Sequence, residues 1–308
     1  MDDQLYDVII IGGGPAGLTA GLYTSRAKLN TLLVEQMMVG GQVMTTTKVE
    51  NYPGFPGGID GPDLVGRFQE HCQEFGLQIT NGEAQKLVDA GDHKVVTVDG
   101  KELRAKAIII TTGAEPRKLG IPGEQKLTGR GVSYCATCDG AFFREVPVAV
   151  VGGGDTAAEE ALFLTRFASK VYLIHRRDQL RATKTLQERI LANDKIEVLW
   201  DTVPEEVLAD QRGVNELRLA NKKTGEKSSL AVEGVFFAIG VIPKAHFLTE
   251  VLKLNDEGYI LTDEECRSSM PGVFAAGDVR SKILKQIATA VGDGAVAAIA
   301  TEKYLDEV

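Results

Sequence analysis

The sequence predicts an α/β protein with two Rossmann-like, three-layer dinucleotide-binding domains, the second inserted into the first. One observation is a buried strand, a glycine-rich turn and a helix at residues 6–25, the pattern of a dinucleotide-binding unit. Another is the return of this pattern from residue 148 onward. The third is the length of 308 residues, which favours two domains with ample buried cores.

A second internal repeat places the domain boundaries. Residues 107–116 and 234–243 each contain an apolar strand, a glycine and, three residues later, a proline. We interpret Pro116 and Pro243 as two chain crossings between domains. The segment after the second crossing has no dinucleotide turn of its own, so we expect it to complete the first domain. The predicted division is a discontinuous domain of residues 1–116 and 244–308 and an inserted domain of residues 117–243.

The bulk composition excludes several classes of protein. A formal net charge of -9 argues against a nucleic-acid or anionic-membrane partner, because either would favour a basic face. No apolar run approaches the length of a bilayer span, and residues 1–4 lack the positive charge that leads a signal peptide. Four cysteines do not form a disulfide scaffold, so we expect a cytoplasmic protein whose close cysteine pair is catalytic or metal-binding.

The first glycine-rich turn follows an apolar strand at residues 6–11. Gly12 permits the tight turn, Gly14 lets a pyrophosphate approach the backbone, and Gly17 allows close packing of helix on strand. The amino end of the helix offers unpaired N–H groups and a positive dipole to the phosphates. Glu35 ends the second strand, where its carboxylate can accept from ribose hydroxyls. We therefore predict that this unit holds a dinucleotide such as FAD.

The second turn, Gly152–Ala157, repeats the first, and Asp155 can cap the helix that it opens. His175 follows Gly152 at the same interval that separates Glu35 from Gly12, so it takes the place of the acid. Three arginines come after it: Arg176, Arg177 and Arg181. Arginines favour a 2′-phosphate where an acid favours a free hydroxyl. An exposed basic turn is the plainer alternative. We predict that this unit binds NADPH.

Other patterns predict the rest of the first domain. A helix at residues 63–75 carries Cys72 on its apolar face, where we expect a packed rather than a reactive thiol. An Asp-Gly turn predicts a hairpin at residues 95–105. Residues 107–111 then read as a further buried strand.

Two glycine-rich stretches are harder to interpret. The region at residues 40–54 is too punctuated by glycine and proline for regular structure. Residues 286–305 are mostly helical, and Gly292 and Gly294 near the start suggest close approach to a ligand.

The cysteine pair Cys135–Cys138 lies shortly before the second turn, which begins at Gly152. Such a pair can hold or release two electrons as a disulfide, because one thiolate attacks a partner and its neighbour resolves the mixed disulfide. A zinc site is the structural alternative, but no second close pair of ligands is evident. A module that only senses NADPH would leave the pair unexplained. Asp139 disfavours a thiolate by its charge, yet suits a proton shuttle.

These features resemble one known family. C-A-T-C-D at residues 135–139 stands before the second turn, H-R-R-x-x-x-R follows at residues 175–181, and G-D stands at residues 277–278. Nearly the whole chain is similar to the low-molecular-weight, bacterial-type thioredoxin reductases of the FAD- and NADPH-dependent pyridine nucleotide-disulfide oxidoreductases. The resemblance implies a homodimeric thioredoxin-disulfide reductase that passes electrons from NADPH through FAD and the Cys135–Cys138 disulfide to thioredoxin or a thioredoxin-like protein.

The resemblance also implies the site residues, and the lack of a second close ligand pair predicts no metal site. Cys135 and Cys138 would form the redox disulfide, with Asp139 as the acid–base residue. FAD would be held by Gly12, Gly13, Gly14, Pro15, Ala16, Gly17, Glu35, Gly41, Gln42, Asn51, Thr112, Gly113, Asp278, Lys285, Gln286 and Ile287. NADPH would be held by Gly154, Asp155, Thr156, Glu159, His175, Arg176, Arg177, Arg181, Ile239 and Gly240. Lys285 stands where the family often has arginine.

Related enzymes offer alternative functions. A flavoprotein that reduces a peroxiredoxin normally carries extra N-terminal thioredoxin-like domains, for which we expect no room before Tyr6. Small-molecule dithiol oxidases and ferredoxin-linked relatives tend to lack the arginine cluster. Relatives that reduce NADP from ferredoxin lack the cysteine pair.

Overall fold

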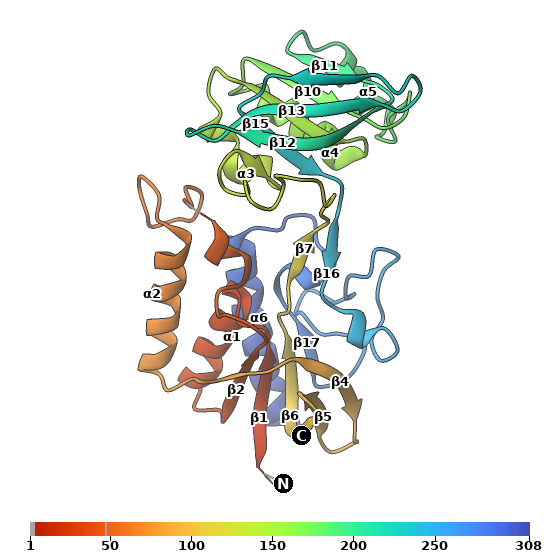
Figure 1. Ribbon diagram of the computed structural model, residues 1–308. Helices are drawn as coiled ribbons and strands as arrows, with labels where there is room; N and C mark the ends of the chain where they lie inside the picture. The colour runs from red at the N-terminus through yellow and green to blue at the C-terminus, as the bar shows by residue number, and fades with distance from the viewer. Residues whose placement is uncertain (1–3, 47) are drawn as a thin grey trace. The chain divides into compact units, whose positions relative to one another are not determined.

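The computed structural model describes residues 4–46 and 48–308, and the chain divides into two compact units (Figure 1). The discontinuous unit comprises residues 1–115 and 242–308, and the inserted unit comprises residues 116–241. Most of the segment on which the expectation about a signal peptide rests, residues 1–3, lies outside the described residues. Among the residues that are described, no helix is long and apolar enough to cross a membrane.

The discontinuous unit is built on one mixed sheet with the strand order β3-β2-β1-β6-β5-β4, and β17 also pairs with β6. Strands β3, β2, β1, β6 and β17 run parallel, whereas β4 and β5 form an antiparallel extension. The strands are β1 (Leu5–Ile11), β2 (Thr31–Glu35), β3 (Gln78–Asn81), β4 (Ala84–Asp89), β5 (Lys94–Val98), β6 (Lys101–Ile110) and β17 (Val273–Ala275).

Strand β6 corrects one prediction. The second strand of the predicted hairpin and the buried strand after it are one continuous strand of 10 residues. One edge of β6 pairs with β1 from Arg104 to Ile110. The other edge pairs with β5 over residues 101–105 and with β17 over residues 108–110. Because the partner changes midway, the polar first half and the apolar second half look like two elements in the sequence.

Both faces of the parallel strands are buried, which explains why β1 is apolar at every position from Val8 to Ile11. Ile10 and Ile109 pack in one buried cluster, and Ile9 and Ile108 pack in another. The helices of the unit are α1 (Pro15–Arg26), α2 (Gly61–Glu74) and α6 (Ile287–Glu307), with short 3-10 helices η1 (Gly41–Thr45), η3 (His246–Leu248) and η4 (Gly277–Val279).

Helices α1 and α6 pack closely through small residues. A Cβ on Gly294 would stand 2.3 Å from the carbonyl oxygen of Ala16 in α1. The close approach predicted for Gly294 is therefore to a neighbouring helix and not to a ligand. The helix predicted around Cys72 is confirmed as α2, and the thiol is buried and donates to the carbonyl oxygen of Leu18 at 3.1 Å. Helix η1 corrects the expectation of no regular structure at residues 40–54.

The inserted unit contains a second parallel sheet with the order β11-β10-β9-β15-β8, and an antiparallel sheet with the order β12-β13-β14. The parallel strands and helices of both units confirm the predicted pair of Rossmann-like folds. The strands are β8 (Val132–Ser133), β9 (Pro147–Gly152), β10 (Lys170–Ile174), β11 (Ile196–Leu199), β12 (Thr202–Ala209), β13 (Val214–Asn221), β14 (Lys227–Leu230) and β15 (Gly234–Ala238). The helices are α3 (Ala136–Asp139), α4 (Asp155–Leu164) and α5 (Lys184–Leu191), with the 3-10 helix η2 (Gly140–Phe142).

Two short strands accompany the passage of the chain between the units. Strand β7 (Ala114–Pro116) pairs with β16 (Val241–Pro243) in a two-stranded sheet (Figure 1). These strands contain the two prolines that were interpreted as crossings. The N–H of Arg117 donates to the carbonyl oxygen of Gly240 at 2.9 Å, which extends the pairing by one residue on each strand.

Candidate active site

The first glycine-rich turn leaves the amino end of α1 open. Gly12 has a φ of 108°, and a Cβ there would stand 2.5 Å from the carbonyl oxygen of Thr111. A Cβ on Gly17 would stand 1.9 Å from the carbonyl oxygen of Gly12, so this position requires glycine for packing. Around Gly14, by contrast, no described atom lies within 4 Å of the added carbon. The turn therefore presents free space and backbone at a helix amino end, which suits a phosphate.

Glu35 is fixed beside this turn. Its Oε2 accepts from the N–H of Gly13 at 2.6 Å, and its Oε1 accepts from the N–H of Met37 at 3.0 Å. The carboxylate at the end of β2 is therefore held next to the glycines, as a group that accepts from ribose hydroxyls must be. Contact with a ribose stays a prediction.

Other residues predicted to hold FAD come together from distant parts of the discontinuous unit. The side chain of Asn51 donates to Oε1 of Gln286 at 2.9 Å, across 235 residues of sequence. Gln42 donates to the carbonyl oxygen of Ala114. The hydroxyl of Thr112 donates to the carbonyl oxygen of Lys244 at 2.6 Å. Two of these contacts join the segment after β6 to η1 and to the residue after β16.

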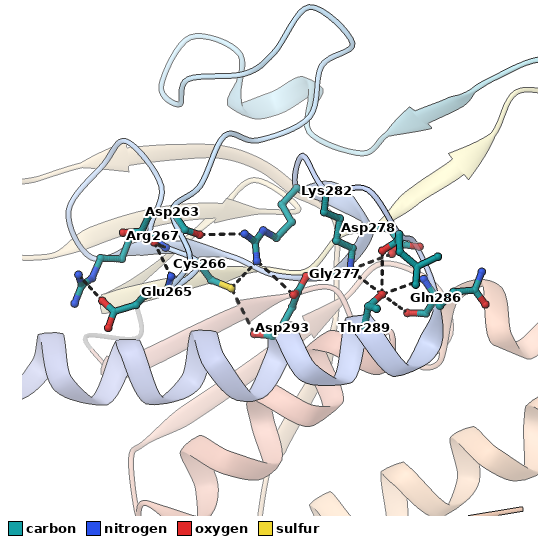
Figure 2. A network of polar contacts seen from close by, with 12 residues as sticks. Asp263, Glu265, Cys266, Arg267, Gly277, Asp278, Lys282, Gln286, Thr289 and Asp293 are labelled. Atoms are coloured by element: carbon teal, nitrogen blue, oxygen red, sulfur yellow. Dashed lines mark hydrogen bonds and ion pairs between the residues drawn. The ribbon is translucent and has the colours of Figure 1, made fainter. Parts of the chain in front are cut away.

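The segment between β17 and α6 supplies the last part of this set (Figure 2). Gln286 caps α6 together with Thr289 in a reciprocal capping box. Burial raises the pKa of the Asp278 carboxyl above its usual range. Oδ1 of Asp278 is buried, and no described residue forms a hydrogen bond with it. An orphaned carboxylate oxygen of this kind fits a bound molecule that carries hydroxyl groups. Lys285 packs its ammonium 4.1 Å from the centre of the Tyr259 ring.

The second glycine-rich turn, like the first, has a tightly packed first glycine and open space around its third. A Cβ on Gly152 would stand 2.6 Å from the Cβ of Ala157, whereas no described atom lies within 4 Å of one on Gly154. Nδ1 of His175 lies 3.0 Å from the carbonyl oxygen of Gly152, and burial lowers the pKa of this histidine. A neutral imidazole thus stands in the inserted unit where Glu35 stands in the discontinuous unit.

One polar side chain near this turn, that of Asp155, differs from expectation. Asp155 does not cap α4: it is the first helical residue, and its Oδ1 accepts from the N–H of Thr183 at 2.7 Å. The predicted cap is therefore wrong, because the extended N-cap position belongs to Gly154. The exposed positions predicted to bind NADPH gather at the carboxyl edge of the sheet: Asp155, Thr156, Glu159, Arg176, Arg177 and Arg181. Within the described residues, no carboxylate forms an ion pair with any of the three arginines.

Cys135 and Cys138 form a disulfide, with their Cα atoms 5.3 Å apart. Cys135 is the N-cap of the short helix α3, and its Sγ accepts from the N–H of Cys138 at 3.2 Å. Asp139 accepts from the hydroxyl of Ser133 at 2.7 Å, and burial raises the pKa of its carboxyl. A carboxyl with a raised pKa can hold a proton beside the sulfurs.

Sheet topology places the disulfide and the second turn at the same edge. Strands β8, β9 and β15 are parallel neighbours, so their carboxyl ends meet at one edge of the sheet. Strand β8 leads to Cys135, β9 leads to Gly152, and β15 leads to Ile239 and Gly240. Among the described residues, no three histidine, cysteine or acidic side chains gather as a metal-binding group.

Comparison with known proteins agrees with the resemblance noted in the sequence. Residues 6–294 match the family described as pyridine nucleotide-disulphide oxidoreductase. The chain belongs to this family. It is 49% identical to a thioredoxin reductase of Listeria monocytogenes, covering 100% of this chain and 96% of that protein. It is 47% identical to the Bacillus subtilis thioredoxin reductase, covering 100% and 97%.

A solved structure extends the likeness from sequence to fold. The crystal structure of thioredoxin reductase from Streptococcus pyogenes is 47% identical, with a TM-score of 0.95 and 99% of each chain covered. The resemblance to bacterial-type thioredoxin reductases is therefore confirmed. Membership of the family implies a flavin and a nicotinamide cofactor.

Several residues of the site were missed by the sequence analysis. Ser133, which binds Asp139, stands before the cysteines without any motif of its own. Glu160 accepts from the N–H of Ala136 at 3.3 Å, and burial raises the pKa of its carboxyl to about 7. Asp293 contacts the segment that contains Asp278. No spacing rule marks these three side chains, because each acts through a contact that only the folded chain creates.

Proposed function

We propose that this chain is a thioredoxin-disulfide reductase that passes electrons from NADPH through FAD and the Cys135–Cys138 disulfide to thioredoxin. The observation that carries the proposal is the disulfide at the carboxyl edge of a Rossmann-like sheet, in a member of this family. No observation favours a dithiol oxidase or a peroxiredoxin reductase. The resemblance also supports a homodimer that acts in the cytoplasm.

In this proposal the discontinuous unit holds FAD. The turn from Gly12 to Gly17 receives the pyrophosphate, Glu35 accepts from the adenosine ribose, and Asp278 offers its orphaned oxygen to another hydroxyl. Asn51, which donates to Gln286, and the other predicted residues outside the turn would complete the flavin site. Bound FAD would supply the hydride-accepting chemistry that side chains lack.

The inserted unit holds NADPH. Gly154 leaves room for the pyrophosphate at the amino end of α4, and Arg176 and Arg177 bind the 2′-phosphate. His175 is buried, and its Nδ1 contacts the carbonyl oxygen of Gly152. Its ring would therefore hold the backbone of the turn in the conformation that receives NADPH. The exposed arginines have no carboxylate partner in the described part of the chain, which leaves them available for an anion.

The dithiol formed on reduction transfers its electrons by thiol–disulfide exchange. One thiolate attacks the disulfide of thioredoxin, and a mixed disulfide forms while one thiolate of thioredoxin leaves. The second thiol then attacks as a thiolate, which restores the Cys135–Cys138 disulfide and releases reduced thioredoxin. Asp139 can donate a proton to a departing thiolate, because its burial favours the neutral, protonated carboxyl.

An anaerobic titration of the FAD-loaded protein with NADPH tests the whole path. We expect NADPH to bleach the flavin absorbance, and oxidised thioredoxin to restore it with release of thioredoxin thiols. An absorbance that NADPH bleaches but oxidised thioredoxin leaves bleached would contradict the proposed acceptor.

The choice of nicotinamide cofactor should depend on Arg176 and Arg177. Charge-assisted hydrogen bonds contribute about 1.5–3 kcal/mol each, so losing one should weaken NADPH binding about ten- to a hundredfold. We expect Arg176→Ala with Arg177→Ala to raise the KM for NADPH by at least this factor and to leave NADH nearly unaffected. Arg212→Ala, an exposed arginine between β12 and β13, is the matched control. Equal losses for both nucleotides would show that these arginines do not read the 2′-phosphate.

A further inference from the structure

Asp293 in α6 joins three donors from the segment that precedes the helix (Figure 2). Its Oδ2 accepts from the N–H of Gly277 at 3.0 Å and from Nζ of Lys282 at 3.0 Å. Its Oδ1 accepts from Nη1 of Arg280 at 3.3 Å. The side chain is only 17% exposed. A buried carboxylate with two cations and a backbone N–H fixes the position of everything it touches.

Arg280 makes this anchor rigid. Its Nη1 also donates to Sγ of Cys266 at 3.0 Å, and its Nη2 donates to the carbonyl oxygen of Asp263 at 3.0 Å. The guanidinium is therefore tied to the loop before β17 as well as to α6. Asp293 has little freedom to move away from Gly277, whose φ of 79° belongs to the tight turn before Asp278.

Lys282 lies between two carboxylates. Its Nζ is 3.0 Å from Oδ2 of Asp293 but 3.7 Å from Oδ1 of Asp278. It also donates to the hydroxyl of Thr289 at 3.2 Å. The longer of the two distances exceeds that of a hydrogen bond, so the ammonium is hydrogen-bonded to Asp293 and forms only a longer ion pair with Asp278. This division leaves Oδ1 of Asp278 buried without a hydrogen-bond donor among the described residues.

We propose that Asp293 is a positioning residue for the flavin site: it retains Lys282 and anchors the Gly277 turn, so that Asp278 keeps an oxygen available for a hydroxyl of the cofactor. The proposal rests on the proposed function, in which Asp278 binds FAD. If Asp293 were uncharged, Lys282 would shorten its ion pair with Asp278 to a hydrogen bond, because that carboxylate would be the nearest remaining anion. The paired carboxylate would then accept poorly from the cofactor.

Two variants separate the charge of Asp293 from its shape. Asp293→Asn keeps the size and one acceptor oxygen for Gly277 but releases Lys282. We expect it to weaken binding of FAD to the folded apoprotein about ten- to a hundredfold, the effect of one lost charge-assisted hydrogen bond. Adding Lys282→Gln removes the released cation. The double variant should therefore bind FAD at least about five times more tightly than Asp293→Asn alone, because mutations of contacting residues are not additive.

Asp7→Asn is the matched control. Asp7 also accepts from a backbone N–H, that of Asn30 at 2.9 Å, and from a lysine, Lys106 at 2.8 Å. It lies at the start of β1, at the opposite end of the strand from the glycine-rich turn. We expect its loss to change the melting temperature of the apoprotein and not the dissociation constant of FAD.

The measurements are the dissociation constant of FAD, from quenching of flavin fluorescence, and the melting temperature of each apoprotein. Wild-type apoprotein that binds no FAD, or Asp278→Ala that binds it as well as wild type, would overturn the flavin assignment itself. With that assignment intact, a lower melting temperature of Asp293→Asn at an unchanged dissociation constant would overturn the inference, since the role would be structural only. So would a double variant that binds FAD no better than Asp293→Asn.

Discussion

Replacing Cys135 or Cys138 by serine is expected to abolish reduction of thioredoxin while NADPH still bleaches the flavin. A serine cannot form or resolve a disulfide, so the electron path ends before the protein partner. Removing one member of a unit that acts together typically costs several orders of magnitude, and we expect a loss of more than about a thousandfold. Stopped-flow absorbance with NADPH, followed by a thioredoxin assay on the same sample, measures both halves of the reaction.

Cys72→Ser is the control for this experiment. Cys72 is buried in α2, its thiol donates to the carbonyl oxygen of Leu18, and burial raises the pKa of the thiol to about 11. A serine can make the same hydrogen bond, so activity should stay close to that of wild type. Turnover of thioredoxin at a near wild-type rate by either Cys135→Ser or Cys138→Ser would mean that the pair is not the relay.

The parts of the fold that are set by short stretches of sequence, such as glycine turns and buried strands, were predictable. At Gly12 and Gly17 a Cβ would collide with backbone atoms, so only glycine fits there. This requirement makes the glycine motif recognisable in the sequence. The buried strands β1 and β9 are apolar at nearly every position, since both faces of a parallel strand are covered. Glu35 is the last residue of β2 and His175 directly follows β10, at equal distance from their turns, which made the repeat visible.

The parts that depend on pairing partners were not predictable in this way. Strand β6 was split into two because its neighbour changes from β5 to β17, which changes its pattern midway. Strand β12 was missed although it pairs with β13 along most of its length, because Pro204 and a register shift interrupt its alternation. Asp293 illustrates the same limit in the site: its partners are 11 to 16 residues away, and the turn between them brings them together.

Gly14→Val and Gly154→Val should each abolish binding of one cofactor and spare the other. Both glycines are extended N-cap residues, with φ of -72° and -93°, a conformation that suits a β-branched residue. No described atom lies within 4 Å of a Cβ at either position, so both variants should fold. The added methyl groups occupy the space at the helix amino end that a pyrophosphate needs.

We expect Gly14→Val to lose more than about a hundredfold in FAD affinity, since at least two charge-assisted bonds to phosphate are prevented, and to keep NADPH binding. Gly154→Val should remain yellow and lose NADPH affinity to a similar extent. Calorimetric titration of each protein with each cofactor measures all four affinities. Gly66→Val in α2, where a Cβ also meets open space, should bind both. Because Gly14 and Gly154 have nearly the same conformation and both adjoin open space, shape alone does not tell which cofactor each unit holds. Only the neighbouring groups do, Glu35 in one unit and Arg176 with Arg177 in the other. If Gly14→Val lost NADPH and Gly154→Val lost FAD, those neighbours would have been assigned the wrong ligands, and the electron path would have to be drawn in the opposite order through the two units.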